Sequence, residues 1–408
     1  MTFTRAGLVA GLVLGCAMAA AGQAKAPVTF SKEVAPIFYK NCVECHRPTM
    51  FAPMSLLTYN EARPWARSIK NKIVAREMPP WSADPAIGHF RNDPRLSQTD
   101  IDTIVAWVDG GAPKGDDKDL PKAPKFTDGW TIGEPDMVLT MTESFHVPAK
   151  GTIPYTYITI PLNIPADRWL KAIEIRPGSR QHVHHVIAYT QPKGTDSKEE
   201  NPLGRSNIGG TTPNKPGVVF GDGIARLLRS NSDIVLQMHY TTNGVEADDR
   251  TTIGLIFAKE PPKKMTRGGM VLNPRFIIPA GAPNHEVRGT LPIAEDTLLT
   301  SMTPHMHNRG KDMTYVAHFP DGKNETLLSV PKYNFDWQLT YFLAEPRLLP
   351  KGTIIEVIAH YDNSPANKAN PDPTANVRWG DQTWEEMMIG FFGAIVDAPP
   401  AATKPPGR

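Results

Sequence analysis

Ile234-Val235-Leu236-Gln237-Met238-His239-Tyr240 is the stretch that shows most clearly how this chain is built. Its pattern alternates with the period of a β-strand, in which successive side chains point to opposite faces. Similar runs recur at 155–160, 170–175 and 353–358, each bounded by Pro, Gly or Asn. Many such short strands, over roughly 270 residues, predict β-sandwiches.

The composition agrees with this prediction. The 408 residues include 40 prolines, which favour short strands and many turns over long helices. Lys and Arg number 44 against 42 for Asp and Glu, so the net charge is +2 and no nucleic-acid partner is implied. At about 150 residues per domain, the length suggests two to three domains.

The N-terminus resembles an export signal. Arg5 precedes the apolar run 6–14 and small residues with Ala-x-Ala patterns, so cleavage is expected within 21–26. The run is too short to span a bilayer, and we predict a periplasmic or secreted protein with no transmembrane span after cleavage. Cys16 follows a weak lipoprotein-like box, in which Leu14 is an unusual residue, so a lipid anchor is the less favoured alternative.

Cys42-Val43-Glu44-Cys45-His46 is a c-type haem attachment motif. It predicts one haem c, bound covalently by Cys42 and Cys45, with His46 as an axial ligand of the iron. A redox-active cysteine pair would not need the histidine. A zinc site would need more cysteines than the chain has left, because it contains only three.

The surroundings of the motif are typical of a small helical cytochrome. Helical patterns cover 30–40 and the segment from Ser97, the expected N-cap, to Gly110. Met78, in a proline-rich loop like those of class I cytochromes c, is the expected second axial ligand, ahead of Met54 and His89. The tryptophans at positions 65, 81 and 107 are expected to pack inside this domain.

These patterns predict a multidomain protein, with a small all-α cytochrome c domain followed by two all-β sandwiches. We expect a signal peptide at 1–26, the cytochrome domain at 27–115 and a charged, proline-rich linker at 116–128. The sandwiches would occupy 129–262 and 263–397, divided near the Pro- and Lys-rich stretch 259–264. The proline-rich end, 398–408, is predicted to be a disordered tail.

Six of the 12 histidines fall in three groups within the β region. The groups are His182-Val183-His184-His185, His239, and His305-Met306-His307. Residues two apart on a strand share a face, so His305 and His307 can bind one metal, and so can His182 and His184. His184 and His185 would point apart unless a bulge re-aims one of them. Three histidines suit zinc, whereas a methionine partner would favour copper.

Four stretches resemble, in order, segments of the type II, ascorbate-dependent copper monooxygenases, the family of peptidylglycine α-hydroxylating monooxygenase and dopamine β-monooxygenase. The stretches are 183–186, 235–240, 305–311 and 379–387, and the match spans about 130 to 395. The resemblance implies jelly-roll-like sandwiches facing each other across a water-filled cleft. It also implies two coppers: an electron-transfer copper on His184, His185 and His239, and a catalytic, oxygen-binding copper on His305, His307 and Met387. His182 and His360 would be neighbours whose membership stays open.

The chain departs from this family in two ways. Its β region has no cysteine, whereas the animal members are rich in disulfides. Thr303 stands where the peptide-amidating enzyme has an arginine for the substrate carboxylate, and Ile389 and Phe391 replace polar partners of the same group. A glycine-extended peptide is therefore not expected as the substrate, and the replacements favour a more hydrophobic or aromatic molecule.

The predicted function is that of an exported copper monooxygenase, which hydroxylates a C–H bond of a small-molecule substrate with O2. Its electrons would come from an ascorbate-like reductant or a periplasmic redox protein, relayed by the fused haem. The alternative is an electron-carrying cytochrome joined to a copper- or carbohydrate-binding β-sandwich module without catalysis.

Overall fold

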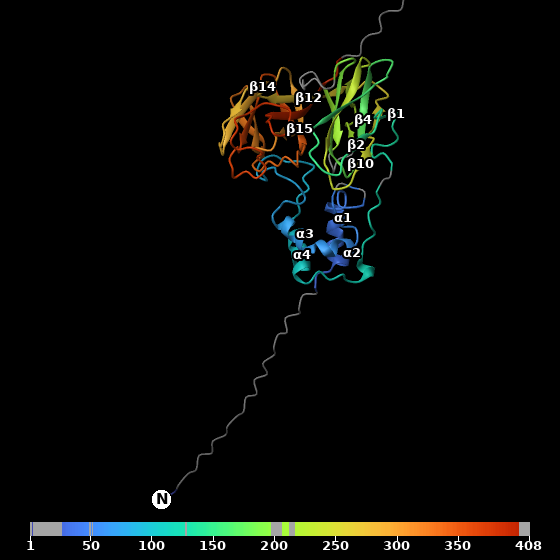
Figure 1. Ribbon diagram of the computed structural model, residues 1–408, viewed down its shortest axis with the longest axis vertical. Helices are drawn as coiled ribbons and strands as arrows, with labels where there is room; N and C mark the ends of the chain where they lie inside the picture. Colours follow the sequence, from blue (N-terminus) through green and yellow to red (C-terminus); the bar gives the residue numbers. More distant parts are fainter. Residues whose placement is uncertain are drawn as a thin grey trace, which may run out of the picture.

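The structure is a computed structural model that describes residues 2, 27–48, 50, 52–126, 129–196, 206–211 and 217–399. Figure 1 shows the helices gathered at one end of the molecule, below two β-rich bodies that lie side by side. The predicted signal with Cys16, and most of the predicted tail, fall outside the described residues. Within them, no helix has both the length and the apolar character needed to cross a membrane.

The protein is thus mostly β-sheet with a few N-terminal helices, as the sequence predicted at this level. The helical part packs around Phe30, Phe38 and Trp107, whose rings lie 6.0–6.3 Å apart. Ser97 caps the longest helix by accepting a hydrogen bond from the Asp100 backbone N–H. The helices are a π-helical turn Phe30–Val34, α1 (Ala35–Asn41), α2 (Tyr59–Ala62), a 3₁₀ turn Arg63–Trp65, α3 (Ala66–Val74), α4 (Gln98–Asp109) and a 3₁₀ turn Asp117–Asp119.

The first sandwich follows the helices. Its strands are β1 (Met137–Thr140), β2 (Phe145–Val147), β3 (Thr156–Ile160), β4 (Arg168–Arg176), β5 (Val183–Pro192), β6 (Ser206–Thr211), β7 (Gly217–Val219), β8 (Ile224–Leu228), β9 (Ser232–Tyr240), β10 (Ala247–Asp249) and β11 (Thr252–Phe257). A sheet of order β3-β9-β5-β6 packs against strands β1-β11-β4-β8, and side chains from both sheets form one hydrophobic core.

Strand β9 shows why this core forms. Ile234, Leu236, Met238 and Tyr240 alternate along the strand and all enter the first core. Their alternation places His239 on the opposite face of the sheet, away from that core. The sequence pattern therefore both builds the sandwich and turns one histidine outward.

The second sandwich repeats this arrangement with other strands. They are β12 (Lys264–Leu272), β13 (Ile277–Ile278), β14 (His285–Pro292), β15 (Thr297–His305), β16 (Gly310–His318), β17 (Asn324–Val330), β18 (Tyr341–Leu349), β19 (Ile354–Tyr361), β20 (Val377–Arg378) and β21 (Ile389–Asp397). A sheet of order β14-β19-β16-β17 packs on β12-β21-β15-β18. Because β8 pairs with β12, one nine-stranded sheet continues from the first sandwich into the second.

A segment between α3 and α4, which we call the strap (residues 81–93), leaves the helical part and lies on the second sandwich. Ala83 is buried in the second core, and Trp81 and Phe90 pack against it. The prediction that Trp81 packs inside the cytochrome domain is therefore wrong, whereas Trp107 does so. Trp65 is an exposed residue of the helical part.

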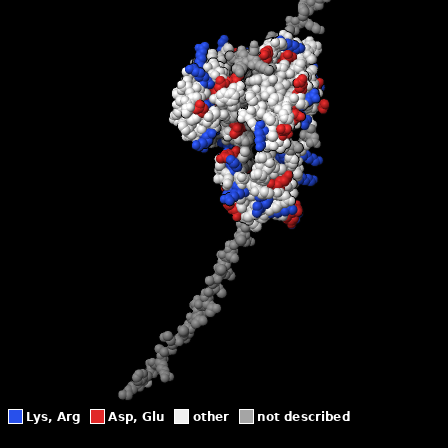
Figure 2. Space-filling model, viewed as in Figure 1, with Lys and Arg blue, Asp and Glu red and all other residues white. Residues whose placement is uncertain are grey.

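Charged side chains are scattered over the surface. On the face shown in Figure 2, Lys and Arg are interspersed with Asp and Glu, without one large field of a single sign. This view agrees with the near-neutral net charge of +2.

Candidate metal centres

The first histidine group depends on a β-bulge. Val183 pairs with Tyr240, but the next pair along β5 and β9 is His185 with His239, so His184 is an extra residue on β5. A bulge re-aims the side chain of the extra residue. Two adjacent histidines, which a regular strand would send to opposite faces, therefore reach one site.

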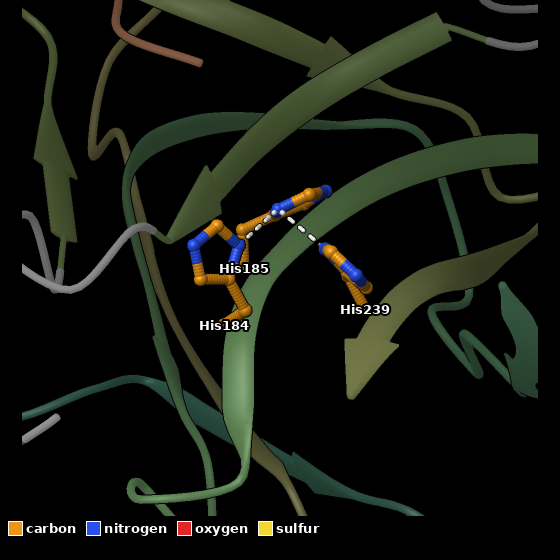
Figure 3. Close-up of side chains that lie close together, drawn as sticks. All are labelled: His184, His185 and His239. Carbon is orange, nitrogen blue, oxygen red and sulfur yellow. Dashed lines mark hydrogen bonds between the residues drawn. The ribbon is translucent and has the colours of Figure 1, made fainter. Parts of the chain in front are cut away.

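The three imidazoles converge through their Nδ1 atoms (Figure 3). Nδ1 of His185 lies 3.1 Å from Nδ1 of His184 and 3.4 Å from Nδ1 of His239. An ion about 2.0 Å from each nitrogen, the usual imidazole–metal distance, would see these pairs at roughly 100–115°. The three residues can therefore hold one metal ion, with nitrogen atoms that already lie within 4.8 Å of one another.

These imidazoles are neutral at pH 7. Burial lowers the pKa of His239 to about 4, and it also lowers the pKa of His184 and, more strongly, that of His185. Neutral imidazole is the form that binds a metal. The site therefore does not have to lose protons before an ion enters.

His182 does not belong to this group. Its Nδ1 lies 2.7 Å from the Ser179 hydroxyl, and its Nε2 lies 2.9 Å from Oδ1 of Asn243 and 3.1 Å from the carbonyl of Val245. Since carbonyl oxygens only accept, Nε2 donates and Nδ1 accepts from Ser179. Both ring nitrogens have partners within the protein, so the structure favours His185 over His182 as the third member.

The second histidine group lies at the end of β15. Met306 enters the second core, and the flanking His305 and His307 have ring centroids 5.3 Å apart at 89°. Nδ1 of His305 lies 2.6 Å from Oε1 of Gln338, and Nδ1 of His307 lies 3.2 Å from the carbonyl of Glu385. Each Nδ1–H is thus a donor, which leaves Nε2 as the metal-binding atom of each ring. The backbone of Gln382 makes a further hydrogen bond to His307.

Met387 lies just before the strand that pairs with this group. His305 pairs with Ile389 of β21, two residues after Met387, and Met387 is 7% exposed. The carboxylate of Glu386 accepts hydrogen bonds from the backbone N–H groups of His307, at 2.8 Å, and of Arg309, at 2.6 Å. The segment that carries Met387 is therefore tied to the turn that carries His307.

Glu386 and His307 have strongly shifted pKa values. Burial raises the pKa of Glu386 to about 8, against the lowering effect of the backbone N–H groups of Arg309 and His307. Burial lowers the pKa of His307 to about 3, so this imidazole is also neutral at pH 7. Glu386 was singled out from the sequence only as a member of the stretch 379–387, without any sign of its anchoring role.

One loop of the second sandwich lies between the two groups. The Phe335 ring is 6.0 Å from the His239 ring and 6.0 Å from the His307 ring, so at most twice that distance separates the two imidazoles. The adjacent Asp336 makes a backbone hydrogen bond to His184. The sequence analysis missed Phe335, Asp336 and Gln338, because an irregular loop has no periodicity that marks it.

The haem motif forms one tight turn after α1. The backbone N–H groups of Cys45 and His46 both donate to the carbonyl of Cys42, at 3.2 and 2.9 Å. Burial raises the pKa of Cys42 to about 12 and that of Cys45 to about 11. Redox-active cysteine pairs have a lowered thiol pKa, so the motif does not resemble a thioredoxin-like site.

The position of His46 bears on the axial ligands. Its Nδ1 lies 3.3 Å from the carbonyl of Met54 and donates to it, which leaves Nε2 free. Met54 thus stands behind His46 rather than in front of Nε2. His89 is exposed, and its carbonyl accepts from Ala344 of the second sandwich at 2.8 Å. Met78 follows α3, and its backbone N–H donates to the Lys72 carbonyl at 3.4 Å, so this contact keeps it with the helical part that carries His46.

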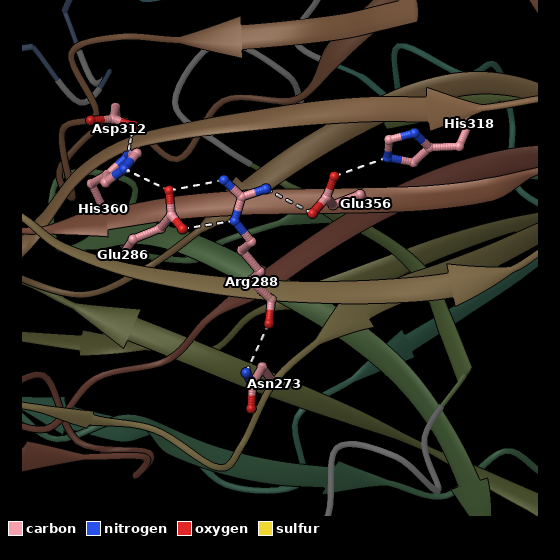
Figure 4. A network of polar contacts seen from close by, with 7 residues as sticks. All are labelled: Asn273, Glu286, Arg288, Asp312, His318, Glu356 and His360. Carbon is pink, nitrogen blue, oxygen red and sulfur yellow. Dashed lines mark hydrogen bonds and ion pairs between the residues drawn. The ribbon is translucent and has the colours of Figure 1, made fainter. Parts of the chain in front are cut away.

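His360 belongs to a surface network rather than to a metal group (Figure 4). Its Nδ1 lies 2.6 Å from Asp312 and its Nε2 lies 3.4 Å from Glu286. Arg288 joins Glu286 to Glu356, and His318 completes the chain of contacts at 2.9 Å from Glu356. The network spans the outer face of strands β14, β19 and β16.

No protein-family model matches this chain, and no curated protein matches it. Among solved structures, it is similar to the major capsid protein P2 of bacteriophage PM2, with a TM-score of 0.30 and 9% identity, over 65% of this chain and 98% of that one. A structure of broad bean stain virus has a TM-score of 0.25 and 8% identity, over 57% and 76%. Allantoicase from Saccharomyces cerevisiae has a TM-score of 0.18 and 9% identity, over 60% and 80%. These matches assign neither a family nor a function.

Proposed function

We propose that this protein is an exported monooxygenase that carries one haem c and two copper ions on a cytochrome domain and two jelly-roll-like sandwiches. It hydroxylates a C–H bond of a small organic molecule with O2. The observation that carries the proposal is the presence of two histidine groups, one on each sandwich, on either side of Phe335. This arrangement agrees with the resemblance to the type II copper monooxygenases.

The donor atoms favour copper over zinc. The first group offers three imidazole nitrogens, and the second offers two, beside the segment that carries Met387. A thioether is a ligand that reduced copper accepts and zinc rarely uses. Of two coppers at these sites, one would bind O2 and the other would store the second electron. Two electrons are needed because one oxygen atom enters the substrate and the other leaves as water.

The protein side chains hold this chemistry in place. Gln338 fixes the tautomer of His305, and the Glu385 carbonyl fixes that of His307. Glu386 anchors the turn 307–309 by accepting a hydrogen bond from the Arg309 backbone N–H. A ligand whose other nitrogen is hydrogen-bonded keeps its orientation without a metal. The sites are therefore largely preorganised for an ion.

Two aromatic side chains lie next to the second group. Phe391 lies 6.0 Å from the His305 ring, and Phe335 lies beside His307. Apolar walls exclude water from a reaction centre and favour apolar ligands. We therefore propose a hydrophobic or aromatic substrate rather than a glycine-extended peptide.

The haem is proposed on the residues of the tight turn. Cys42 and Cys45 would hold it through thioether bonds, while Nε2 of His46 and the thioether of Met78 would ligate the iron. The neutral thiols and the hydrogen-bonded Nδ1 of His46 fit this role. The haem would receive electrons from an ascorbate-like reductant or a redox protein of the same compartment.

Metal analysis with optical and paramagnetic spectroscopy tests the proposal. We expect one haem and two coppers per chain, with one copper lost in His185→Ala and the other weakened or lost in Met387→Leu. His182→Gln is the matched control and should keep both. Zinc in place of copper would contradict the proposal. Two bound coppers without O2-dependent hydroxylation of any apolar compound tested would instead support a binding module.

A further inference from the structure

The strap carries an aromatic cluster that joins the helical part to the second sandwich. The Trp81 ring lies 4.7 Å from the ring of Tyr341 on β18, and Phe90 lies 6.0 Å from Trp81 and 5.6 Å from Tyr341. All three pairs are arranged edge to face, a favourable geometry for aromatic rings. The cluster thus fixes one point of the strap on the second core.

Backbone hydrogen bonds hold the rest of the strap against β17 and β18. The Asp84 N–H donates to the Ser329 carbonyl at 2.9 Å, and the Arg91 N–H donates to the Phe342 carbonyl at 3.0 Å. Phe90 also forms a β-bridge with Leu343. The strap therefore behaves as an added edge of the second sandwich and holds Trp81 in one place.

The cluster is only a few residues away from the proposed axial ligand of the haem. Trp81 follows Met78 by three residues, so the backbone between them can span at most about 10 Å. Pro79 and Pro80 occupy the two positions between them and restrict the connection. A haem ligated by Met78 would therefore lie close to the indole.

On its other side, the cluster leads to the second histidine group. Tyr341 pairs with Met302 on β15, and His305 follows three residues later on that strand. Gln338 precedes Tyr341 by three residues, and its Oε1 lies 2.6 Å from Nδ1 of His305. Two short stretches of chain thus connect the Tyr341 ring with His305.

The choice of tryptophan at position 81 is not explained by packing alone. Its Nε1 is buried and has no hydrogen-bond partner among the described residues. Leaving a buried N–H unsatisfied costs free energy that a phenylalanine would not cost. Tryptophan is therefore the costlier aromatic residue at this position, and packing does not account for its larger ring system.

We propose that Trp81 and Tyr341 form the route by which the haem on Cys42–His46 passes electrons to the copper centre of His305 and His307. This inference rests on the proposed function and names the electron entry point. One electron leaves the iron, which goes from ferrous to ferric, and reduces copper(II) to copper(I), with no bond made and no proton moved. A one-electron donor outside the chain reduces the iron again. Trp81 and Tyr341 are positioning residues, which supply the contact and keep their own oxidation state.

Flash reduction of the oxidised holoprotein, without O2 or substrate, tests the route. A photoexcited one-electron donor reduces the haem, and loss of the ferrous α-band reports electron transfer to copper. We expect Trp81→Leu to slow this phase at least tenfold and Trp81→Phe to slow it less. Trp65→Phe is the matched control, because Trp65 is a tryptophan of the helical part that is 42% exposed and lies outside the aromatic cluster, and it should leave the rate unchanged. The phase should survive in His239→Ala and disappear in His307→Ala.

Haem spectra and copper content are measured first in every variant, so that a folding or loading defect is recognised. A normal rate in Trp81→Leu would overturn the route. A phase lost in His239→Ala but kept in His307→Ala would also overturn it. Electrons would then enter at the first group, through Arg180, which lies close enough to Cys45 to lower its pKa. A protein that binds no haem or no copper contradicts the proposed function itself, and with it the route.

Discussion

His182 and His185 are three residues apart on the chain, and their ring nitrogens have different partners. His182 is satisfied on both sides, by Ser179 and by Asn243, whereas Nδ1 of His185 faces two other imidazoles. We therefore expect His182→Ala to lower the free energy of unfolding by about 1–3 kcal/mol, since it removes a side chain that is 3% exposed together with its hydrogen bonds. Copper content should stay at two per chain.

His185→Ala is the comparison for this prediction at the residue scale. This variant should lose the copper of the first group. The free energy of unfolding of its metal-free form should change little or even increase, because one of three crowded imidazoles is removed. Chemical denaturation of the metal-free variants and metal analysis of the loaded ones separate the two cases. A copper lost in His182→Ala, with an unchanged free energy of unfolding, would reverse the assignment.

At the scale of the element, the surface network on β14, β16 and β19 predicts a pH dependence. The hydrogen bond to Glu356 raises the pKa of His318 above its ordinary value. A raised pKa contributes stability at a pH below the unfolded value of about 6.5, and this contribution is lost as the pH rises through the folded value. Because the His318 side chain is 35% exposed, solvent screening should keep the contribution below about 1 kcal/mol.

The measurement compares the free energy of unfolding of the wild type and of His318→Gln at pH 5.5 and at pH 8.5. The difference between the two proteins should be larger at the lower pH and should shrink with added salt. Glu356 also pairs with Arg288, so that pair must be kept intact in both proteins. A difference that grows at the higher pH would contradict the assigned direction of the pKa shift.

The strands also show how far the sequence predicts this molecule. The alternation in 234–240 predicts both the buried side of β9 and the outward position of His239, because a period of two is a property of the strand itself. The bulge at His184 is not predicted by any local pattern, since it is defined by pairing with a strand about 55 residues away. The resemblance to a family, rather than periodicity, indicated the adjacent pair. The loop 333–338 and the strap were missed for the same reason, because contacts between distant segments leave no periodic signal.

At the scale of the whole molecule, the strap shows that the division into a helical part and two sandwiches does not follow the order of segments along the chain. Residues 81–93 are placed between two helices in sequence, but Ala83 is 6% exposed in the core of the second sandwich. Ala62, by comparison, is fully buried in the core of the helical part. Substituting each alanine therefore tests whether its segment packs in the second sandwich or in the helical part.

We expect Ala83→Asp to destabilise the second sandwich and Ala62→Asp to destabilise the helical part, because a buried, unpaired carboxylate costs several kcal/mol. Hydrogen exchange followed by mass spectrometry locates the effect. In Ala83→Asp, amides of β17 and β18 should exchange faster while those of α1 and α4 keep their protection, and Ala62→Asp should show the reverse. Faster exchange confined to the helices in Ala83→Asp would mean that the strap belongs to the cytochrome domain after all. It would also remove the fixed position of Trp81 on which the proposed electron transfer to the second sandwich depends.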